Sequence, residues 1–278
     1  MKNKIDKYIK KIRKDGYAII PNLVSKKQSE MLKTFLNKDY QKYKNKYFIK
    51  KYKNLADKQT EKVVFNLHNK NLIWFKLFEN KKVISILNVL LKEGSYKNSE
   101  PYYLNNISAR CPMNGHKGQL IHLDSNLAGV NYNIIVNVMW VLDDFNKNNG
   151  STYIVPKSHM IKRYANNDKV IKNKVLIKAK QGSVIIFNAN LWHGGSEKKN
   201  DSSRWAVLLG YARWFIKPSF DYMKNTPKKI FKKLTNEQKS LLGFDLIPPK
   251  DEFTRMTRRS NYYEIPENYK LINDKNKI

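Results

Sequence analysis

The sequence predicts a mainly β fold with flanking helices, built around a double-stranded β-helix core of the jelly-roll or cupin-like type. Seven short β-rich runs follow one another between residues 102 and 214, with turn signals and no helical pattern between them. The flanking residues show helical spacing instead. With 278 residues, 41% of them hydrophobic, the chain can bury a sizeable core. We expect one domain in three parts: a mostly helical part over 1–100, the jelly-roll core over 101–217, and a helical or irregular extension over 218–278.

Helices are expected to dominate the first part of the chain. Apolar residues recur at helical spacing over 5–12, and a short strand over 16–21 ends at Pro21. Ser25 is expected to cap a helix that runs to about residue 36, and two further helices are expected within 71–91. Residues 40–60 are charged and aromatic without a clear period, so we expect a loop or lid there.

The predicted strands of the core are short and are bounded by turn residues. They cover residues 102–109, 118–123, 133–142, 152–155, 175–179, 183–187 and 203–214. Turn signals occur at Gly150-Ser151 and at Gln181-Gly182. After Pro218 we expect helical or irregular structure, with a helix over 234–242 and fraying of the last ~15 residues.

The formal net charge of +31 comes almost wholly from lysine. Eight of the 54 basic residues are arginine, which leaves 46 lysines. Lysine does not form the bidentate contacts with phosphates and base edges that arginine forms. We interpret the charge as a solvated lysine surface produced by compositional bias, with an anionic substrate or partner as the alternative. Dedicated nucleic-acid binding is not expected.

Cysteine content and hydropathy limit the classes of site and compartment. Cys111 is the single cysteine, which excludes an internal disulfide and a cysteine-based zinc cluster, so any metal must be held by histidine and carboxylate. No apolar run approaches the ~18 residues of a membrane span, and the N-terminus lacks the apolar region of a signal peptide. We expect no membrane span and a cytoplasmic protein.

Three residues form a candidate metal site. Side chains alternate between the two faces of a strand, so His122 and Asp124 point to the same side of the predicted strand 118–123. His193 follows the predicted strand 183–187 and can supply a third ligand. Two histidines and one carboxylate form the facial triad of non-haem Fe(II) oxygenases. The histidine–carboxylate spacing by itself also fits a structural or surface pair.

Arg204 is the second candidate functional residue. It lies eleven residues after His193, within the predicted strand 203–214 and among apolar neighbours. An arginine buried in a barrel strand needs an anionic partner, because an unpaired buried charge is costly. A dicarboxylate such as 2-oxoglutarate could supply one, since the guanidinium group binds carboxylates bidentately. An internal ion pair or a solvent-facing position is the alternative.

Ordered motifs run through most of the chain. They are DGYAIIPN (15–22), QLIHLD (119–124), VMWVLDD (138–144), NGSTYIVPKSH (149–159), GSVIIF (182–187) and LWHGG (191–195), followed by Arg204. In this order they resemble the phytanoyl-CoA dioxygenase family of Fe(II)/2-oxoglutarate-dependent oxygenases. Two positions depart from the family pattern: Lys157 replaces a glycine in the turn before His159, and Ser183 replaces an aspartate.

The resemblance implies a role for each matching residue. His122, Asp124 and His193 would ligate Fe(II), and Arg204 would clamp the distal carboxylate of 2-oxoglutarate. The implied reaction consumes 2-oxoglutarate and O2, releases succinate and CO2, and hydroxylates a C–H bond of a small-molecule substrate. Desaturation and ring formation are related outcomes. Halogenation is not expected, because related halogenases lack the carboxylate that this chain retains at Asp124.

Three further residues match positions near the co-substrate. Trp140 falls where the family often has an aromatic residue lining the co-substrate pocket, although a place in the core fits it equally well. Arg110, twelve residues before His122, falls where some relatives carry a basic residue that reaches the co-substrate. Ser196 could donate a hydroxyl, but many relatives have this serine one position earlier.

The other three histidines are not expected to bind the metal. His159 ends a motif that resembles a turn, so we expect it to stabilise that turn. His68 and His116 are expected on the surface, with a place in the substrate pocket as the alternative.

Two alternative functions fit the same residues. A cupin-type metalloenzyme such as an isomerase would use the metal without 2-oxoglutarate, so succinate formation distinguishes it. A non-catalytic basic binding protein would use the jelly roll only as a scaffold. A metal and co-substrate binding assay distinguishes that protein from the oxygenase. The substrate is expected to be a small molecule, and the basic surface mildly favours an anionic one.

Overall fold

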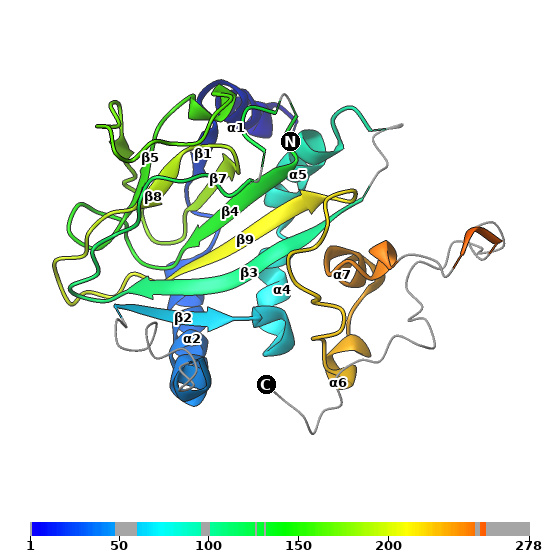
Figure 1. Cartoon of the computed structure of the whole chain (residues 1–278). Helices are drawn as coiled ribbons and strands as arrows, with labels where there is room; N and C mark the ends of the chain where they lie inside the picture. Colours follow the sequence, from blue (N-terminus) through cyan, green and yellow to red (C-terminus); the bar gives the residue numbers. More distant parts are fainter. Residues whose placement is uncertain are drawn as a thin grey trace.

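Two antiparallel sheets form the centre of the molecule (Figure 1). The computed structural model describes residues 2–47, 60–95, 101–125, 127–130, 132–247 and 251–253. The larger sheet has the order β1-β7-β4-β9-β3-β2, with β1 Tyr17–Ile20, β7 Val184–Asn188, β4 Ile135–Val141, β9 Ala206–Arg213, β3 Tyr102–Pro112 and β2 Glu61–Phe65. The smaller sheet has the order β6-β5-β8, with β6 Val175–Leu176, β5 Thr152–Ile154 and β8 His193–Gly195. The expected mainly β fold with flanking helices is confirmed.

The central strand β4 is buried on both faces of the larger sheet. Val136, Val138 and Trp140 belong to the cluster that packs on the helices, whereas Met139 and Val141 belong to a second cluster with residues of the smaller sheet. This division follows the period-two alternation of a strand. The face that meets the smaller sheet is called the inner face below.

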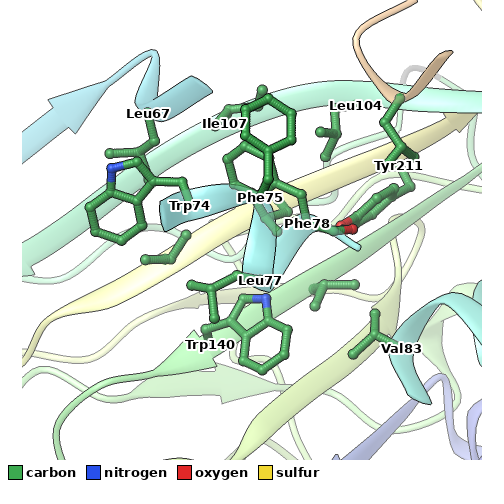
Figure 2. Packing of buried hydrophobic residues seen from close by; sticks show 14 of the residues in the cluster. Leu67, Trp74, Phe75, Leu77, Phe78, Val83, Leu104, Ile107, Trp140 and Tyr211 are labelled. Carbon is green, nitrogen blue, oxygen red and sulfur yellow. The ribbon is translucent and has the colours of Figure 1, made fainter. Parts of the chain in front are cut away.

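Helices cover the other face of the larger sheet (Figure 1). They are α1 Lys2–Asp15, α2 Lys26–Tyr47, α4 Phe75–Phe78 and α5 Lys81–Lys92. Figure 2 shows Trp140 beside Leu77 of α4, within a cluster that includes Phe75, Phe78 and Tyr211. The Tyr211 hydroxyl donates to the Phe78 carbonyl oxygen at 2.7 Å. Full burial of each such side chain contributes roughly 1.5–3 kcal/mol, so this cluster is a main source of stability.

The helix after Ser25 is longer than the sequence suggested. Ser25 and Gln28 form a capping box, since the Ser25 hydroxyl accepts from the Gln28 N–H at 3.1 Å and the Gln28 side chain accepts from the Ser25 N–H at 3.0 Å. The helix then continues to Tyr47, so the loop expected over 40–47 is wrong. Leu36 and Tyr40, four residues apart on one helix face, are both buried, which extends the packed stripe. Residues 48–59 of the expected lid lie outside the described residues.

The other expected elements are mostly confirmed, with shifted ends. Residues 118–123 are irregular and pair only at a single bridge at His122, and Arg204 precedes β9 instead of lying in it. Strands β2 and β8 were not expected, because the former carries two charged residues and the latter two glycines. The expected helix over 234–242 is α7 Asn236–Leu241, which follows the short helix α6 Lys228–Phe231. No described helix is long and apolar enough to cross a membrane.

His68 is fully buried, which contradicts its expected surface position. It lies in the 3-10 turn Leu67–Asn69, and its ring packs edge-on against Tyr222 with the ring centroids 4.7 Å apart. Burial lowers the pKa of His68 to about 3. The neutral imidazole is therefore the form that the folded protein accommodates.

This burial predicts a loss of stability in mild acid. An unfolded histidine titrates near pH 6.5, so the contribution of His68 is fully present above that pH and is lost as the pH falls towards 3. The free energy of unfolding should fall by up to about 1.4 kcal/mol per pH unit in this window on account of His68. Urea unfolding followed by tryptophan fluorescence should show a smaller pH dependence in His68→Phe, which keeps an aromatic ring against Tyr222. An identical pH dependence in the two proteins would contradict this assignment.

Candidate active site

Backbone pairing brings the two candidate histidine ligands together. His122 and His193 form an antiparallel bridge in which each backbone N–H donates to the other residue's carbonyl oxygen at 2.8 Å. Their rings consequently lie side by side, with centroids 4.4 Å apart. Gly194 allows this close approach, because a Cβ atom there would lie 2.8 Å from the Gln119 carbonyl oxygen. The Asp124 N–H donates to the Ala189 carbonyl oxygen at 2.9 Å, which fixes the backbone of the third candidate ligand beside the two histidines.

Both imidazole rings are oriented by backbone carbonyl groups. Nδ1 of His122 lies 2.9 Å from the Leu120 carbonyl oxygen, and Nδ1 of His193 lies 2.9 Å from that of Leu191. A carbonyl oxygen only accepts hydrogen bonds, so in each ring Nδ1 carries the proton and Nε2 offers its lone pair. These Nε2 atoms face Asp124: that of His122 is 3.5 Å from Oδ1, and that of His193 is 3.4 Å from Oδ2.

The three side chains fit a metal ion. Their ligand atoms all lie within 4.8 Å of one another. Ligands at about 2.0–2.2 Å from an ion are themselves about 3 Å apart, which is close to the separations in this triad. Two imidazoles and one carboxylate on one side of an ion leave three positions open, the arrangement typical of non-haem Fe(II) sites.

The charges at the triad suit metal binding. Without a metal, Nε2 of the protonated His122 ring can donate to Asp124, and this hydrogen bond raises the pKa of His122. Burial by itself would raise the pKa of Asp124, but the hydrogen bonds with His122 and His193 outweigh it and hold that pKa well below its usual range. Asp124 is therefore an anion near neutral pH. An amide donor that the sequence did not indicate, Nδ2 of Asn137, also lies 2.7 Å from Oδ2 of Asp124.

Arg204 is buried without a carboxylate partner. Its Nη2 lies 3.4 Å from the Thr152 hydroxyl, its guanidinium carbon lies 4.1 Å from the centre of the Phe145 ring, and its Nε has no described partner. No described carboxylate forms an ion pair with it. Burial lowers the pKa of Arg204 to about 10, which leaves it charged near neutral pH. A buried guanidinium in this state is a binding group for an anion.

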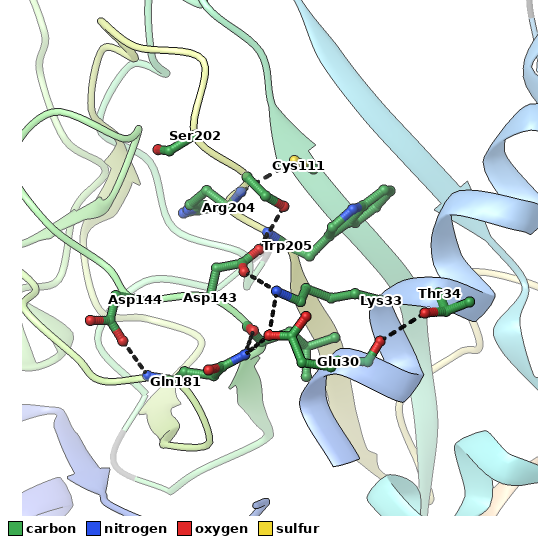
Figure 3. A network of polar contacts seen from close by, with 12 residues as sticks. Glu30, Lys33, Thr34, Cys111, Asp143, Asp144, Gln181, Ser202, Arg204 and Trp205 are labelled. Atoms are coloured by element: carbon green, nitrogen blue, oxygen red, sulfur yellow. Dashed lines mark hydrogen bonds and ion pairs between the residues drawn. The ribbon is translucent and has the colours of Figure 1, made fainter. Parts of the chain in front are cut away.

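Asp143 contacts the residues on both sides of Arg204 (Figure 3). Its Oδ2 accepts from the Ser203 hydroxyl at 2.7 Å and from the Trp205 N–H at 2.8 Å, and its Oδ1 binds the Lys33 ammonium group. The Asp143 carboxylate is thus bound by these neighbours and forms no ion pair with Arg204. The sequence signal for Asp143 was its place at the end of the VMWVLDD motif.

Besides that of Ser29 in α2, two buried hydroxyl groups also have no described partner. They belong to Ser196, which directly follows β8, and to Ser108, which pairs with Leu208 on β3 and β9. Unpaired buried polar atoms are uncommon, and together with Nε of Arg204 they fit a polar ligand in the interior. Ser196 was a sequence-predicted candidate, whereas Ser108 was not.

Two of the expected co-substrate contacts have other partners. Trp140 faces the helices and is fully buried in their cluster, which fits the alternative expectation of a place in the core. Side chains alternate between the two faces of a strand. Asn137 and Met139 occupy the inner face of β4, and Trp140 therefore lies on the helix-facing side. Arg110 binds Glu61 at 2.6 Å, so the structure gives it an internal ion pair.

The remaining histidines are held by local contacts. His116 is half-buried and its Nδ1 accepts from the Gly118 N–H at 2.9 Å, so its expected surface position holds only in part. His159 is buried in the 3-10 turn Ser158–Met160, and its Nε2 lies 3.2 Å from the Arg13 carbonyl oxygen, which fits a role in this turn. Lys157, at the position of the family glycine, has the left-handed φ of 65° that glycine adopts readily.

Comparison with protein families and curated proteins places the chain among dioxygenases. The family described as phytanoyl-CoA dioxygenase (PhyH) matches residues 12–206. The uncharacterized protein Rv1501 of Mycobacterium tuberculosis is 26% identical over 133 residues, which is 48% of this chain and 46% of that protein. The dioxygenase af480 of Aspergillus fumigatus is 24% identical over 189 residues, which is 66% of this chain and 59% of that protein. The chain thus spans roughly half the length of the curated relatives it matches.

Solved structures share the fold. HygX from Streptomyces hygroscopicus, with nickel, 2-oxoglutarate and hygromycin B bound, has a TM-score of 0.60 at 14% identity, covering 76% of this chain and 88% of HygX. The epimerase SnoN, in complex with Fe3+, alpha ketoglutarate and nogalamycin RO, has a TM-score of 0.58 at 12% identity, covering 81% of this chain and 90% of SnoN. At these identities the likeness shows the fold.

The two faces of the larger sheet predict a separation between stability and metal binding. Trp140→Phe should leave a cavity among the helices and destabilise the protein by roughly 1–3 kcal/mol, yet leave metal affinity unchanged. Asp124→Asn should strongly weaken metal binding with little loss of stability, because it removes the charged ligand yet its side-chain oxygen can still accept from the Asn137 amide. Thermal unfolding and isothermal titration with Co(II) measure the two effects. A loss of Co(II) binding in Trp140→Phe would contradict the separation.

Proposed function

The chain belongs to the phytanoyl-CoA dioxygenase family, and we propose that it is an Fe(II)/2-oxoglutarate-dependent hydroxylase that oxidises a C–H bond of a small-molecule substrate. The cofactors of this chemistry are Fe(II) and 2-oxoglutarate, with O2 as co-substrate. One observation carries the proposal: a triad of two histidines and a carboxylate and a buried arginine without a carboxylate partner contact the same inner cluster, through Phe187 against His193 and Phe145 against Arg204. The first supplies a metal site and the second a site for an anionic co-substrate.

The residues of the site divide the work between holding the metal and holding the co-substrate. His122 and His193 would bind the metal through Nε2, and Asp124 through a carboxylate oxygen. Arg204 would bind the distal carboxylate of 2-oxoglutarate, with Thr152 and Ser196 as neighbouring polar groups. These cofactors supply the oxidative decarboxylation of 2-oxoglutarate to succinate and CO2, with one oxygen atom of O2 left for the substrate.

The inner face lines one side of the site with buried apolar side chains. Met139, Ile185 and Phe187 are buried there, and the Phe187 ring packs edge-on against His193 with centroids 5.0 Å apart. Excluding water strengthens the electrostatic contacts of Arg204 and limits side reactions of the oxidant. The large positive charge of the chain supports an anionic substrate as part of the proposal.

Epimerisation is the second candidate, because SnoN shares the fold and is an epimerase. Both reactions begin with removal of a hydrogen atom from carbon and differ in whether oxygen is then added. An isomerase of the cupin type differs from both, since it forms no succinate.

Isotope labelling tests the proposed reaction. The Fe(II)-loaded protein, supplied with 2-oxoglutarate and labelled O2, should form succinate, and a hydroxylated product from a panel of small-molecule acids should carry one labelled oxygen atom. Mass spectrometry of succinate and product gives the answer. A product that gains no oxygen would replace hydroxylation by epimerisation or desaturation, and absence of succinate under all conditions would reject 2-oxoglutarate chemistry.

The buried guanidinium predicts a specific loss of co-substrate affinity. Arg204→Lys should weaken 2-oxoglutarate binding by about ten- to a hundredfold, because an ammonium group cannot reproduce the bidentate contact. Anaerobic titration of the Fe(II)-loaded protein with 2-oxoglutarate, followed by charge-transfer absorption, measures this change. Arg213→Lys is the matched control, since Arg213 lies in β9 and donates to the Asn133 carbonyl oxygen at 2.7 Å. An unchanged dissociation constant in Arg204→Lys would remove this residue from the site.

A further inference from the structure

We infer that Asn137 is a positioning residue that holds one oxygen of Asp124, so that the metal is bound through the other oxygen. This role rests on the proposed function, because it requires Asp124 to ligate a metal. Nothing in the motifs of the sequence indicated Asn137, which lies one residue before the VMWVLDD segment.

The strand β4 places Asn137 beside the triad. Asn137 is the only polar residue of β4, and every residue of this strand is buried. The register puts it opposite Gly210 of β9 and Phe187 of β7, and the Phe187 ring contacts His193. A buried amide in an apolar strand is costly unless it is hydrogen-bonded. The Asn137 amide therefore needs a hydrogen-bond acceptor, and this acceptor is the carboxylate of Asp124.

The hydrogen bond distinguishes the two oxygens of the carboxylate. Nδ2 of Asn137 donates to Oδ2 of Asp124 at 2.7 Å, whereas Oδ1 receives no amide donor from the described residues. Oδ1 therefore keeps its lone pairs for a metal, and it lies 3.5 Å from Nε2 of His122. Oδ2 also lies 3.4 Å from Nε2 of His193, and the hydrogen bond from Asn137 restrains this oxygen, so that binding through Oδ1 alone is favoured. Binding through one oxygen preserves the three open positions that the co-substrate and O2 require.

Gly210 leaves space for the amide group. A Cβ atom at Gly210 would lie 3.3 Å from Oδ1 of Asn137 and 3.4 Å from Cβ of Asn106. The glycine thus lets the Asn137 side chain turn its nitrogen towards Asp124 without crowding. Asn106 lies on the other side of Gly210, is exposed, and its side chain makes no hydrogen bond with the described residues. It provides a matched control from the same inner face.

Metal binding by two variants tests the role. Asn137→Leu keeps the branched shape of asparagine without the donor, and Asn137→Ala removes the amide group. Each should bind Co(II) about ten- to a hundredfold more weakly than the unmodified protein, the usual effect of losing an outer partner of a metal ligand. Co(II) supplied alone should also give a different d–d absorption spectrum, because Asp124 is free to bind through both oxygens. Asn106→Ala should keep both the affinity and the spectrum.

The outcomes separate this role from the proposed function. Weaker Co(II) binding and an altered spectrum in the Asn137 variants, with unchanged thermal unfolding of the metal-free proteins, would support it. A Co(II) affinity in both Asn137 variants equal to that of the unmodified protein would overturn this role and leave the proposed function intact. An equal loss of affinity in Asn106→Ala would have the same consequence. Failure of the unmodified protein to bind Co(II) would overturn the proposed function, and the role of Asn137 with it.

Discussion

The antiparallel pairing of His122 with His193 is the constraint on which the rest of the site depends. It joins an irregular segment to β8 through two backbone hydrogen bonds of 2.8 Å, and it sets both rings on the same side. Asp124 follows two residues later on that side, and the carbonyl groups of Leu120 and Leu191 then select the free nitrogen of each ring. The glycine pair after His193 makes the approach possible, since a side chain at Gly194 would meet the backbone of residues 119 and 120. Backbone hydrogen bonds thus determine the positions of all three side chains of the candidate metal site.

The two faces of the larger sheet have different roles: one packs against the helices and the other faces the candidate site. Its helix-facing side carries Trp140 and Tyr211 among aromatic residues of α4, and its inner face carries Asn137 and Met139. Because strand side chains alternate, each residue of β4 serves one of the two tasks. Polar groups can therefore gather at the inner face without weakening the packing against the helices.

The sequence predicted the parts of the site that depend on residue identity and missed those that depend on parity or on distant contacts. The spacing of His122, Asp124 and His193 was sufficient to predict a shared site, and the structure brings these residues together. Trp140 was left between the core and the co-substrate pocket because the motif gives its position but not its face, although an asparagine three residues earlier in an apolar strand marks the inner side. The helix over 40–47 was missed because lysine-rich segments show little periodicity, and only the burial of Tyr40 reveals it. Asp143 was missed as a partner because its contacts with Lys33 and Trp205 join segments far apart in the chain.

The buried basic residues of the described part of the chain differ in how many of their N–H donors have an acceptor. This difference separates Arg204, the candidate anion-binding group, from the two others. Lys198, Arg204 and Arg213 are the three that are buried. The Lys198 ammonium group donates to the Ser202 carbonyl oxygen, the Ser202 hydroxyl and Oδ1 of Asn200, which accounts for its three donors. Arg213 donates to the carbonyl oxygens of Asn133 and Leu90 and packs over Tyr132. Arg204, with five N–H donors, has one side-chain bond of 3.4 Å and an aromatic ring. Among the described residues, Arg204 is thus the buried guanidinium that is largely unsatisfied, and it contacts the same inner cluster as His193, where a dicarboxylate would complete its hydrogen bonds.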